Sequence, residues 1–298
     1  MIIGVSSKRS ADKNTVGNII KLLVYNDTRS KASNNKDVSL SDFLKLDNSM
    51  HQLTNWQIKK FNDKLKDILC ILINCTKAQL RNIDFKNTEL GEDWWYYRRY
   101  IGNDHKAKPY YELISLYDYN NIKEDSKMFL SLYKLTPRLL SHLIGTKCGI
   151  DIIHPNIWIN ALMSEYKPLV SVSFAIMDLG MNNSQLEKKG QTIPIEYPNW
   201  IITDMRFPNE LEAVKQKNGI TIRVNRNIVK PIFIFEEPAD NEHKSKYIAG
   251  FGSYKPEHVS ETTLDNATFD YIIDNNDKIE ELIEKIKEIL IKEKIISI

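Results

Sequence analysis

Short apolar runs bounded by small or polar residues recur along this chain, and each predicts a strand buried on both faces of a sheet. Segments with helical spacing lie between the runs, so that strands alternate with helices. This order is typical of an α/β protein whose mostly parallel sheet is flanked by helices. The predicted strands cover residues 1–5, 200–204, 220–224 and 269–273.

Apolar residues spaced three or four positions apart predict the helices. The first of these helices follows the opening strand after a polar stretch, as in the first half of a β–α–β unit. Gly219 comes directly after another helix, and we expect it to end that helix as a C′ glycine. The predicted helices cover residues 16–23, 57–81, 137–144, 157–165, 209–217 and 277–295.

Residues 28–130 are expected to form a mainly helical insertion within a single domain that spans residues 1–298. Within it, residues 84–124 are aromatic and charged, with four consecutive aromatic side chains before Arg98 and Arg99. This cluster predicts either a lid that faces a ligand or a packed insertion with solvated edges, and both alternatives stay open. Residues 167–198 show no clear pattern and have room for an extra strand or hairpin.

Composition and charge narrow the classes of function. The chain has 298 residues, of which 42% are hydrophobic and 27% charged, as in a globular protein with a sizeable core. A net charge of +2 gives no sign of a nucleic-acid-binding surface, although a local cationic pocket for small anions is compatible with it. The sequence shows no signal peptide and no membrane-spanning run, and its three cysteines suit a reducing compartment. We therefore expect a cytoplasmic protein with no nucleic acid or membrane partner.

The loop after the first predicted strand is the first candidate for chemistry. Residues 4–15 have the length of a Walker A loop, G-x-x-x-x-G-K-[ST], with Lys13 at the lysine position. In such loops, backbone N–H groups close around phosphates at the N-terminus of a helix. Ser7 and Asp12 stand where the glycines belong, so the motif by itself does not establish a phosphate site.

Charged residues after the predicted strand 200–204 are the second candidate. Asp204 and Arg206 lie at its end, and Glu210 lies in the first turn of the next helix. In open α/β sheets the ligand crevice lies outside the carboxyl ends of the strands. A carboxylate there can hold Mg²⁺ and an arginine can grip a phosphate. The equally supported alternative is a strand end, a proline turn and a helix with an acidic first turn.

Two weaker candidates lie elsewhere in the chain. Arg138 follows Thr136 and Pro137, which are well placed as the N-cap and first residue of a helix, and it could equally be a surface residue. His258 lies between acidic and hydroxyl residues at 257–261, and a lone histidine is more often structural than catalytic.

Ordered blocks that span nearly the whole chain resemble one family. The most specific are D-x-R-F-P-N-E at 204–210 and the F-K-N block at 85–87. The supporting blocks lie at residues 13–15, 136–140, 156–161, 258–261 and 269–275. Together they are similar to the deoxynucleoside monophosphate kinases of bacteriophages and large DNA viruses, which have a P-loop kinase fold.

The resemblance implies transfer of the γ-phosphate of ATP to a deoxynucleoside monophosphate, with ATP and Mg²⁺ as cofactors. Such transfer needs positioning and cations rather than covalent help from the protein. Nucleotides are the implied partners, and homodimers are common among these kinases. The implied catalytic residues are Lys13, Arg138, Asp204 and Arg206; the ATP-binding residues are Ser10, Lys13, Asn14 and Thr15; the acceptor-binding residues are Lys86, Arg138, Trp158, Arg206 and Glu210; the metal-binding residues are Thr15 and Asp204.

Four positions depart from the family pattern. Ser7 and Asp12 replace glycines, Asn14 replaces an aspartate, and Ile150 stands where an arginine is expected. A carboxylate at position 12, about 4 Å from a phosphate, adds repulsion on the order of 4 kcal/mol. A penalty of about 4 kcal/mol weakens ATP binding roughly a thousandfold. The alternative function is therefore a weak or inactive relative that senses nucleotides or binds proteins.

Overall fold

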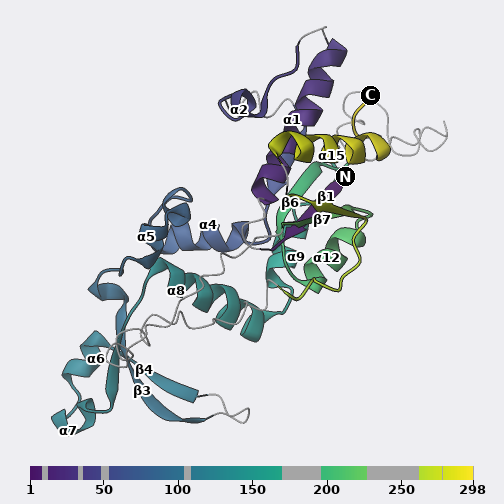
Figure 1. The fold of residues 1–298 in the computed structure, drawn as a ribbon. Coiled ribbons are helices and arrows are strands. Elements are labelled where there is room, and N and C mark those ends of the chain that lie inside the picture. Colours follow the sequence, from purple (N-terminus) through teal and green to yellow (C-terminus); the bar gives the residue numbers. More distant parts are fainter. Residues whose placement is uncertain are drawn as a thin grey trace, which may run out of the picture. The chain divides into compact units, whose positions relative to one another are not determined.

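The computed structural model describes residues 1–8, 13–32, 36–47, 54–103, 109–169, 196–226, 262–276 and 278–297. The chain forms two compact units (Figure 1). The first comprises Met1–Phe61 and Leu162–Ile298, and the second comprises Asn62–Ala161. Along the chain the second unit is thus inserted into the first, with bounds that differ from the expected 28–130. Among the described residues, no helix has the length and apolar character needed to cross a bilayer.

A five-stranded, all-parallel sheet forms the centre of the first unit. Its strands are β1 (Ile2–Ser7), β2 (Trp56–Lys59), β6 (Asn199–Met205), β7 (Ile220–Asn225) and β8 (Tyr271–Asp274). They lie in the order β2-β6-β1-β7-β8, and every neighbouring pair is parallel. Every residue of β1 is buried, as expected for a central strand covered on both faces. The α/β class, the parallel sheet and the four predicted strands are confirmed.

Helices cover both faces of this sheet. On one face, α1 (Lys13–Ala32) and α15 (Ile279–Lys292) share a core cluster with Ile3 and Val5 of β1. On the other, α12 (Pro208–Lys215) approaches Gly4, where an added Cβ would lie 3.2 Å from Val214. Alternate residues of a strand point to opposite faces, so α1 and α12 flank the sheet from opposite sides. A short helix, α2 (Leu40–Phe43), packs its Phe43 against α1.

The prediction of one helix over residues 57–81 was wrong at its start. Residues 56–59 form β2, and the helix α4 covers only Asp63–Leu72. Ile58, which fits a helical stripe in the sequence, pairs with Ile201 of β6 in parallel register. Pairing with a distant strand satisfies the backbone of this short segment, and local periodicity carries no information about such a partner.

The end of α12 also differs from its prediction. Asn218 adopts the left-handed conformation, with φ +51°, and therefore takes the C′ role expected of Gly219. The Gly219 N–H donates to the carbonyl of Val214. An added Cβ on Gly219 would lie 2.9 Å from that carbonyl oxygen and 3.0 Å from the oxygen of Ile2. Glycine is needed here for a close approach of backbones rather than for a positive φ.

The second unit combines short helices around a small apolar core. The core contains Leu69, Leu80, Leu135 and Leu140. As predicted, Thr136 caps α8 (Pro137–His142), which continues into a π-helix, η3 (Leu143–Ile153). The remaining helices are η1 (Gln79–Arg81), α5 (Ile83–Asn87), η2 (Glu92–Trp94), α6 (Leu116–Asn120), α7 (Glu124–Lys127) and, from this unit into the first, α9 (Ile157–Met163).

The second unit also contains a three-stranded antiparallel sheet, which the expectation of a mainly helical insertion did not include. It consists of β3 (Trp95–Asn103), β4 (Pro109–Ser115) and β5 (Leu130–Lys134), in the order β4-β3-β5. Aromatic residues favour strands because their side chains pack well on a pleated surface. Three residues of the aromatic cluster, Trp95, Tyr96 and Tyr97, are therefore part of a strand, and Trp94 ends η2.

Candidate functional site

The order of strands places a topological switch point between the carboxyl ends of β1 and β6. From β1 the chain passes through α1 to β2, on the far side of β6. From β6 it passes through α12 to β7, on the far side of β1. The two connections thus leave neighbouring strands in opposite directions and on opposite faces. Such a switch point is where open α/β sheets bind their ligands.

The register between β1 and β6 is irregular at this point. Gly4 pairs with Ile202, but Ser6 pairs with Met205, so β6 has one extra residue between the two pairs. The irregularity falls on Thr203 and Asp204. Bulges are enriched next to active sites because they re-aim a side chain at the end of a strand. The bulge therefore supports Asp204 as a candidate residue of this site.

The start of α1 reaches the same sheet end. The Lys13 ammonium lies 3.4 Å from the carbonyl oxygen of Ser7, the last residue of β1. The Asn14 side-chain oxygen accepts hydrogen bonds from Lys60 at 2.9 Å and from the Thr203 hydroxyl at 3.4 Å. Residues that follow or end three different strands, β1, β2 and β6, therefore meet at the first turn of α1.

Gly17 allows α1 to approach β6 this closely. An added Cβ would lie 2.7 Å from Cγ2 of Thr203, which is fully buried. We expect Gly17→Ala to destabilise the protein by about 1–3 kcal/mol through overpacking, although alanine is the better helix former. The measurement is the melting temperature, which should fall by several degrees. Gly91→Ala is the matched control, because nothing lies within 4 Å of its added Cβ. Equal melting temperatures of the two variants would contradict the close approach.

Asp204 is held by the end of β2. Its Oδ1 accepts the backbone N–H of Phe61 at 2.9 Å. Its carboxylate and the hydroxyl of Thr15 offer the hard oxygen ligands that Mg²⁺ prefers. Among the described residues, no group of three or more His, Cys, Asp and Glu side chains is arranged to hold a metal. A single carboxylate suits Mg²⁺, which usually keeps several waters and shares its coordination with substrate phosphates.

Glu210 lies close to Asp204 and is largely buried. Its Oε2 accepts the backbone N–H groups of Arg206 at 2.6 Å and Phe207 at 3.0 Å, at the start of α12. Burial raises the pKa of Glu210 to about 7, and the negative charge of Asp204 adds to the increase. The two backbone hydrogen bonds and the positive charge of Arg206 oppose it. The charge of this site therefore changes near neutral pH.

The pKa of Glu210 predicts a pH dependence of stability. The folded protein prefers the protonated carboxyl, so unfolding releases a proton between the ordinary pKa of 4.5 and about 7. The free energy of unfolding therefore falls as pH rises through this window, by an amount on the order of 3 kcal/mol, and levels off above it. Glu210→Gln keeps the oxygen acceptor but removes the ionisation. Its melting temperature relative to wild type should rise from pH 5 to pH 8.

The control for this prediction lies on the same helix. Glu212 is exposed, and Glu212→Gln should leave the pH dependence nearly unchanged. A Glu210→Gln variant whose melting curve moves in parallel with wild type at every pH would show that Glu210 is ionised normally.

A buried ion pair beside β1 was missed by the sequence analysis. Arg223 of β7 donates to the Ser6 hydroxyl at 2.9 Å and pairs with Asp265 at 2.8 Å. Asp265 also pairs with Lys8, at the start of the loop after β1, at 2.8 Å. An arginine within an otherwise apolar strand was the available signal, because a buried charge requires a partner. Lys60 was missed for another reason, since its segment was read as a helix.

The acceptor-side residues predicted from the resemblance belong to the second unit. Arg138 of α8 donates to the Asn87 side chain at 2.8 Å, next to Lys86 at the end of α5. Trp158 donates its indole N–H to the carbonyl of Gly145 at 2.8 Å, and its ring leaves no room for a Cβ on Gly149. These contacts fasten α9 to η3. The role of Trp158 in base stacking stays a prediction.

The predicted site residues are thus divided between the two units. Lys13, Asn14, Thr15, Asp204, Arg206 and Glu210 belong to the first unit, and Lys86, Arg138 and Trp158 belong to the second. Ser10, Asp12 and His258 lie outside the described residues, as does most of the segment 167–198.

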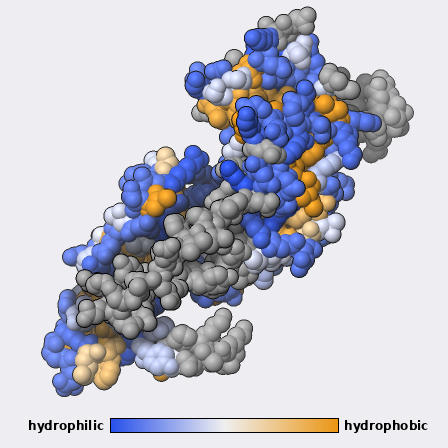
Figure 2. All heavy atoms as spheres, in the orientation of Figure 1, coloured by the Kyte–Doolittle hydropathy of each residue, from blue (hydrophilic) through white to orange (hydrophobic). Residues whose placement is uncertain are grey.

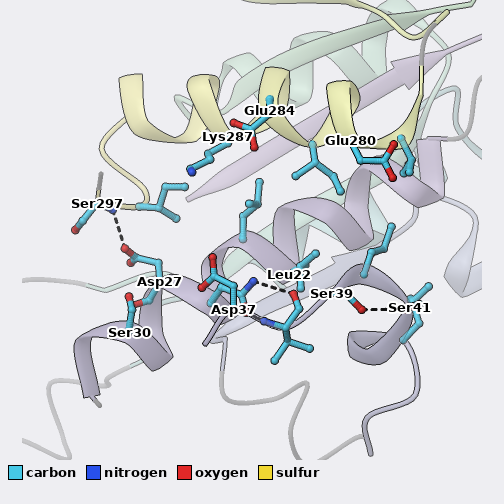
Figure 3. Close-up of a pocket in the computed structure, with 18 of the residues that line it drawn as sticks. Leu22, Asp27, Ser30, Asp37, Ser39, Ser41, Glu280, Glu284, Lys287 and Ser297 are labelled. Atoms are coloured by element: carbon cyan, nitrogen blue, oxygen red, sulfur yellow. Dashed lines mark hydrogen bonds between the residues drawn. The ribbon is translucent and has the colours of Figure 1, made fainter. Parts of the chain in front are cut away.

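A groove of about 1030 Å³ lies between α1, α2 and α15, away from these residues. Apolar side chains gather over this part of the first unit, as Figure 2 shows. In Figure 3 the groove is rimmed by Asp27, Asp37, Glu280, Glu284 and Lys287, and its apolar wall comes mainly from α1, α2 and α15. None of its lining residues belongs to the predicted site. A groove with a mostly acidic rim is poorly suited to a phosphate.

Comparison with models of protein families finds no match for this chain, and comparison with curated proteins finds none at a significant level. We therefore infer its function from the residues at the carboxyl ends of β1 and β6.

Proposed function

We propose that this protein is a P-loop-type nucleotide kinase that transfers the γ-phosphate of ATP to a deoxynucleoside monophosphate. The observation that supports this most is the position of Lys13, Asp204 and Arg206 at the switch point between β1 and β6. Phosphoryl transfer needs cations and metal ligands around a spread negative charge, and these three side chains supply both.

Each residue has a role in this proposal. Lys13 neutralises the β- and γ-phosphates at the N-terminus of α1, where backbone N–H groups and the helix dipole also favour an anion. Arg206 grips a phosphate through its planar fork. Asp204 and Thr15 would hold Mg²⁺, which when bound neutralises developing charge on the transferred group. Glu210 holds the backbone of Arg206 and Phe207, so it positions the arginine.

The second unit is proposed to bind the acceptor. Lys86 and Arg138 offer two cations, and Arg138 donates to the side chain of Asn87, the residue that follows Lys86. Two cations suit the phosphate of a nucleoside monophosphate, and the choice of base is expected to come from the same unit.

Ser7, which stands where the Walker A motif has a glycine, is less of an obstacle to phosphate binding than the motif indicates. Ser7 is the last residue of β1 and pairs with Val224 of β7. Among the described non-glycine residues, a positive φ occurs at Asn55, Asn74, Asn218 and Lys294, and not at Ser7. A side chain is therefore accommodated at position 7 without strain, and this supports a phosphate loop that tolerates serine there.

A second candidate function is a nucleotide-sensing or protein-interaction module without turnover. Asn14 favours it, because its side-chain oxygen is already engaged by Lys60 and Thr203 rather than left for a ligand. Asp12 favours it as well, because a carboxylate in the loop repels phosphate.

Nucleotide binding separates the two candidates from an inactive scaffold. Millimolar ATP with Mg²⁺ should raise the melting temperature, and a concentration of 100 times the dissociation constant adds about 2.7 kcal/mol of stability. A coupled assay of ADP release should then show turnover with at least one of the four deoxynucleoside monophosphates. Binding without turnover would support the sensing module, and no stabilisation by ATP would refute the kinase.

Asp12→Gly provides a direct test of the loop. We expect this substitution to tighten ATP binding, by up to roughly a thousandfold if the full repulsion is relieved. The measurement is ATP titration by calorimetry. An unchanged dissociation constant would show that the loop does not hold phosphate.

A further inference from the structure

The small antiparallel sheet of the second unit has one face rich in tyrosine, which we call the tyrosine face. Its members follow from the register, because directly paired residues point to the same side. Tyr96 pairs with Tyr133, Arg98 with Leu113, and Tyr100 with Tyr111. This side of the sheet also carries Ser115 and Ser131. We give the name tyrosine face to its six larger residues, Tyr96, Arg98, Tyr100, Tyr111, Leu113 and Tyr133.

The opposite face of this sheet is only partly covered, and its charges are paired. Tyr97 stacks on Tyr119 of α6, with ring centroids 3.8 Å apart. Arg99 forms an ion pair with Glu112 at 3.1 Å, and Ile114 is buried. On the tyrosine face, by contrast, Tyr100 is 56% exposed and Leu113 is 66% exposed. Leu132, which pairs with Tyr97 on the opposite face, is also 40% exposed. The two faces therefore differ in the pairing of their charges more than in their exposure.

Arg98 lies at the centre of the tyrosine face. Its guanidinium carbon lies 3.2 Å from the ring centroid of Tyr133 and 4.3 Å from that of Tyr111. Its Nε is buried without a hydrogen-bond partner in the described part of the chain. None of the six residues of the face is acidic, although the neighbouring Arg99 has its carboxylate. A cation that is partly desolvated and faces no anion favours the binding of one.

The surroundings of Arg98 select a phosphate on an aromatic ligand. Two tyrosine rings hold the guanidinium plane, which leaves its in-plane N–H groups for bidentate contact with an oxyanion. Burial raises the pKa of Tyr96, and the positive charge of Arg98 opposes the increase, so the hydroxyl stays protonated beside Arg98. The exposed ring of Tyr100 is a surface on which a base can stack, a contact that tolerates any base.

The number of charges argues for a single nucleotide rather than a strand. Proteins that bind single-stranded nucleic acid track several phosphates with several cations. The tyrosine face carries one cation, and the whole chain has a net charge of only +2. One arginine matches one phosphate.

We propose that the tyrosine face is a second nucleotide site, which binds a mononucleotide through its phosphate at Arg98 and its base at Tyr100. The site uses none of the residues proposed for ATP and for the acceptor phosphate. The proposal does not depend on kinase activity, so it can be tested independently of the proposed function.

Photo-crosslinking of the full chain with 5-iodo-deoxyuridine monophosphate tests the proposal. Irradiation followed by peptide mass spectrometry should place the adduct on Tyr100 or Tyr111. Arg98→Met should reduce labelling at these tyrosines at least tenfold, and the matched variant Arg99→Met should reduce it less than twofold. Lys13→Met should not change it, which separates this site from the proposed ATP site. Excess thymidine monophosphate should compete at least tenfold better than thymidine.

Each other outcome overturns the proposal. No adduct on the three strands, or equal labelling of the Arg98 and Arg99 variants, shows that Arg98 holds no nucleotide. Competition by thymidine as good as that of its monophosphate removes the phosphate contact. Much stronger competition by a thymidine decamer indicates a strand instead. If Arg98→Met does not fold, Arg98→Lys decides, because it must lower labelling at least fivefold with an unchanged melting temperature.

Discussion

Replacing Lys13 with methionine should lower the turnover number for phosphoryl transfer from ATP on the order of a thousandfold. Methionine keeps an unbranched stem of similar length but removes the ammonium group, which lies at the carboxyl end of β1. The charge that develops on the transferred phosphoryl group then loses a protein cation at this strand end. The measurement is the coupled assay of ADP release, with the melting temperature as a check on folding.

Lys8→Met is the matched control for this prediction. Lys8 lies on the other side of the same loop, and its substitution by methionine removes the same charge. Its ammonium, however, pairs with Asp265 at 2.8 Å. We expect its turnover number to stay within about threefold of wild type, because exposed ion pairs contribute little. If the two lysine variants had the same turnover number, the assignment of Lys13 to the phosphates would be wrong.

Asp204→Asn should have the second-largest effect, a loss of turnover of roughly a hundredfold to a thousandfold. The amide oxygen of asparagine can still accept the N–H of Phe61, so the end of β2 should stay in place. What is lost is the negative charge that attracts Mg²⁺. The signature is therefore a raised Mg²⁺ requirement, measured as the Mg²⁺ concentration for half-maximal turnover.

The same variant has an independent readout at Glu210. The charge of Asp204 raises the pKa of Glu210, so Asp204→Asn should lower that pKa and weaken the pH dependence of stability between pH 5 and pH 8. Asp274→Asn, at the carboxyl end of the edge strand β8, is the matched control and should alter neither the Mg²⁺ requirement nor the pH dependence. If the Asp204→Asn variant had a normal Mg²⁺ requirement, the proposal that Asp204 holds the metal would be wrong.

The pattern of apolar and polar residues along the chain was sufficient to predict most strands of the sheet and its main helices. Buried runs at 1–5, 200–204 and 220–224 became β1, β6 and β7, because a strand covered on both faces must be apolar throughout. The helix at the C-terminus was equally readable, since its buried stripe of Leu282, Ile286, Ile289 and Leu290 repeats with the period of a helix. Asp204 and Arg206 were predicted from their place at the end of a strand, and Lys13 from its position in the Walker A spacing.

Features that depend on distant partners were not readable in this way. β2 is only four residues long and exists as a strand through its pairing with β6, whereas its sequence also fits a helix. The bulge at Thr203 and Asp204, the contact of Lys60 with Asn14 and the close approach of Gly17 all arise where α1 and the strands meet. None of these three features produces a periodic pattern of apolar residues in the sequence.

The sequence by itself determined the α/β class, the main helices and the charged residues after the strands, because burial imposes a period on each element. Only the tertiary structure decided which of these charges are neighbours, and that Asn218 rather than Gly219 takes the left-handed position at the end of α12. It also decided that Arg98 faces tyrosines while Arg99 faces a carboxylate. The physical reason is that strand order, register and close contacts join residues far apart along the chain, and local patterns of polarity do not encode those pairings.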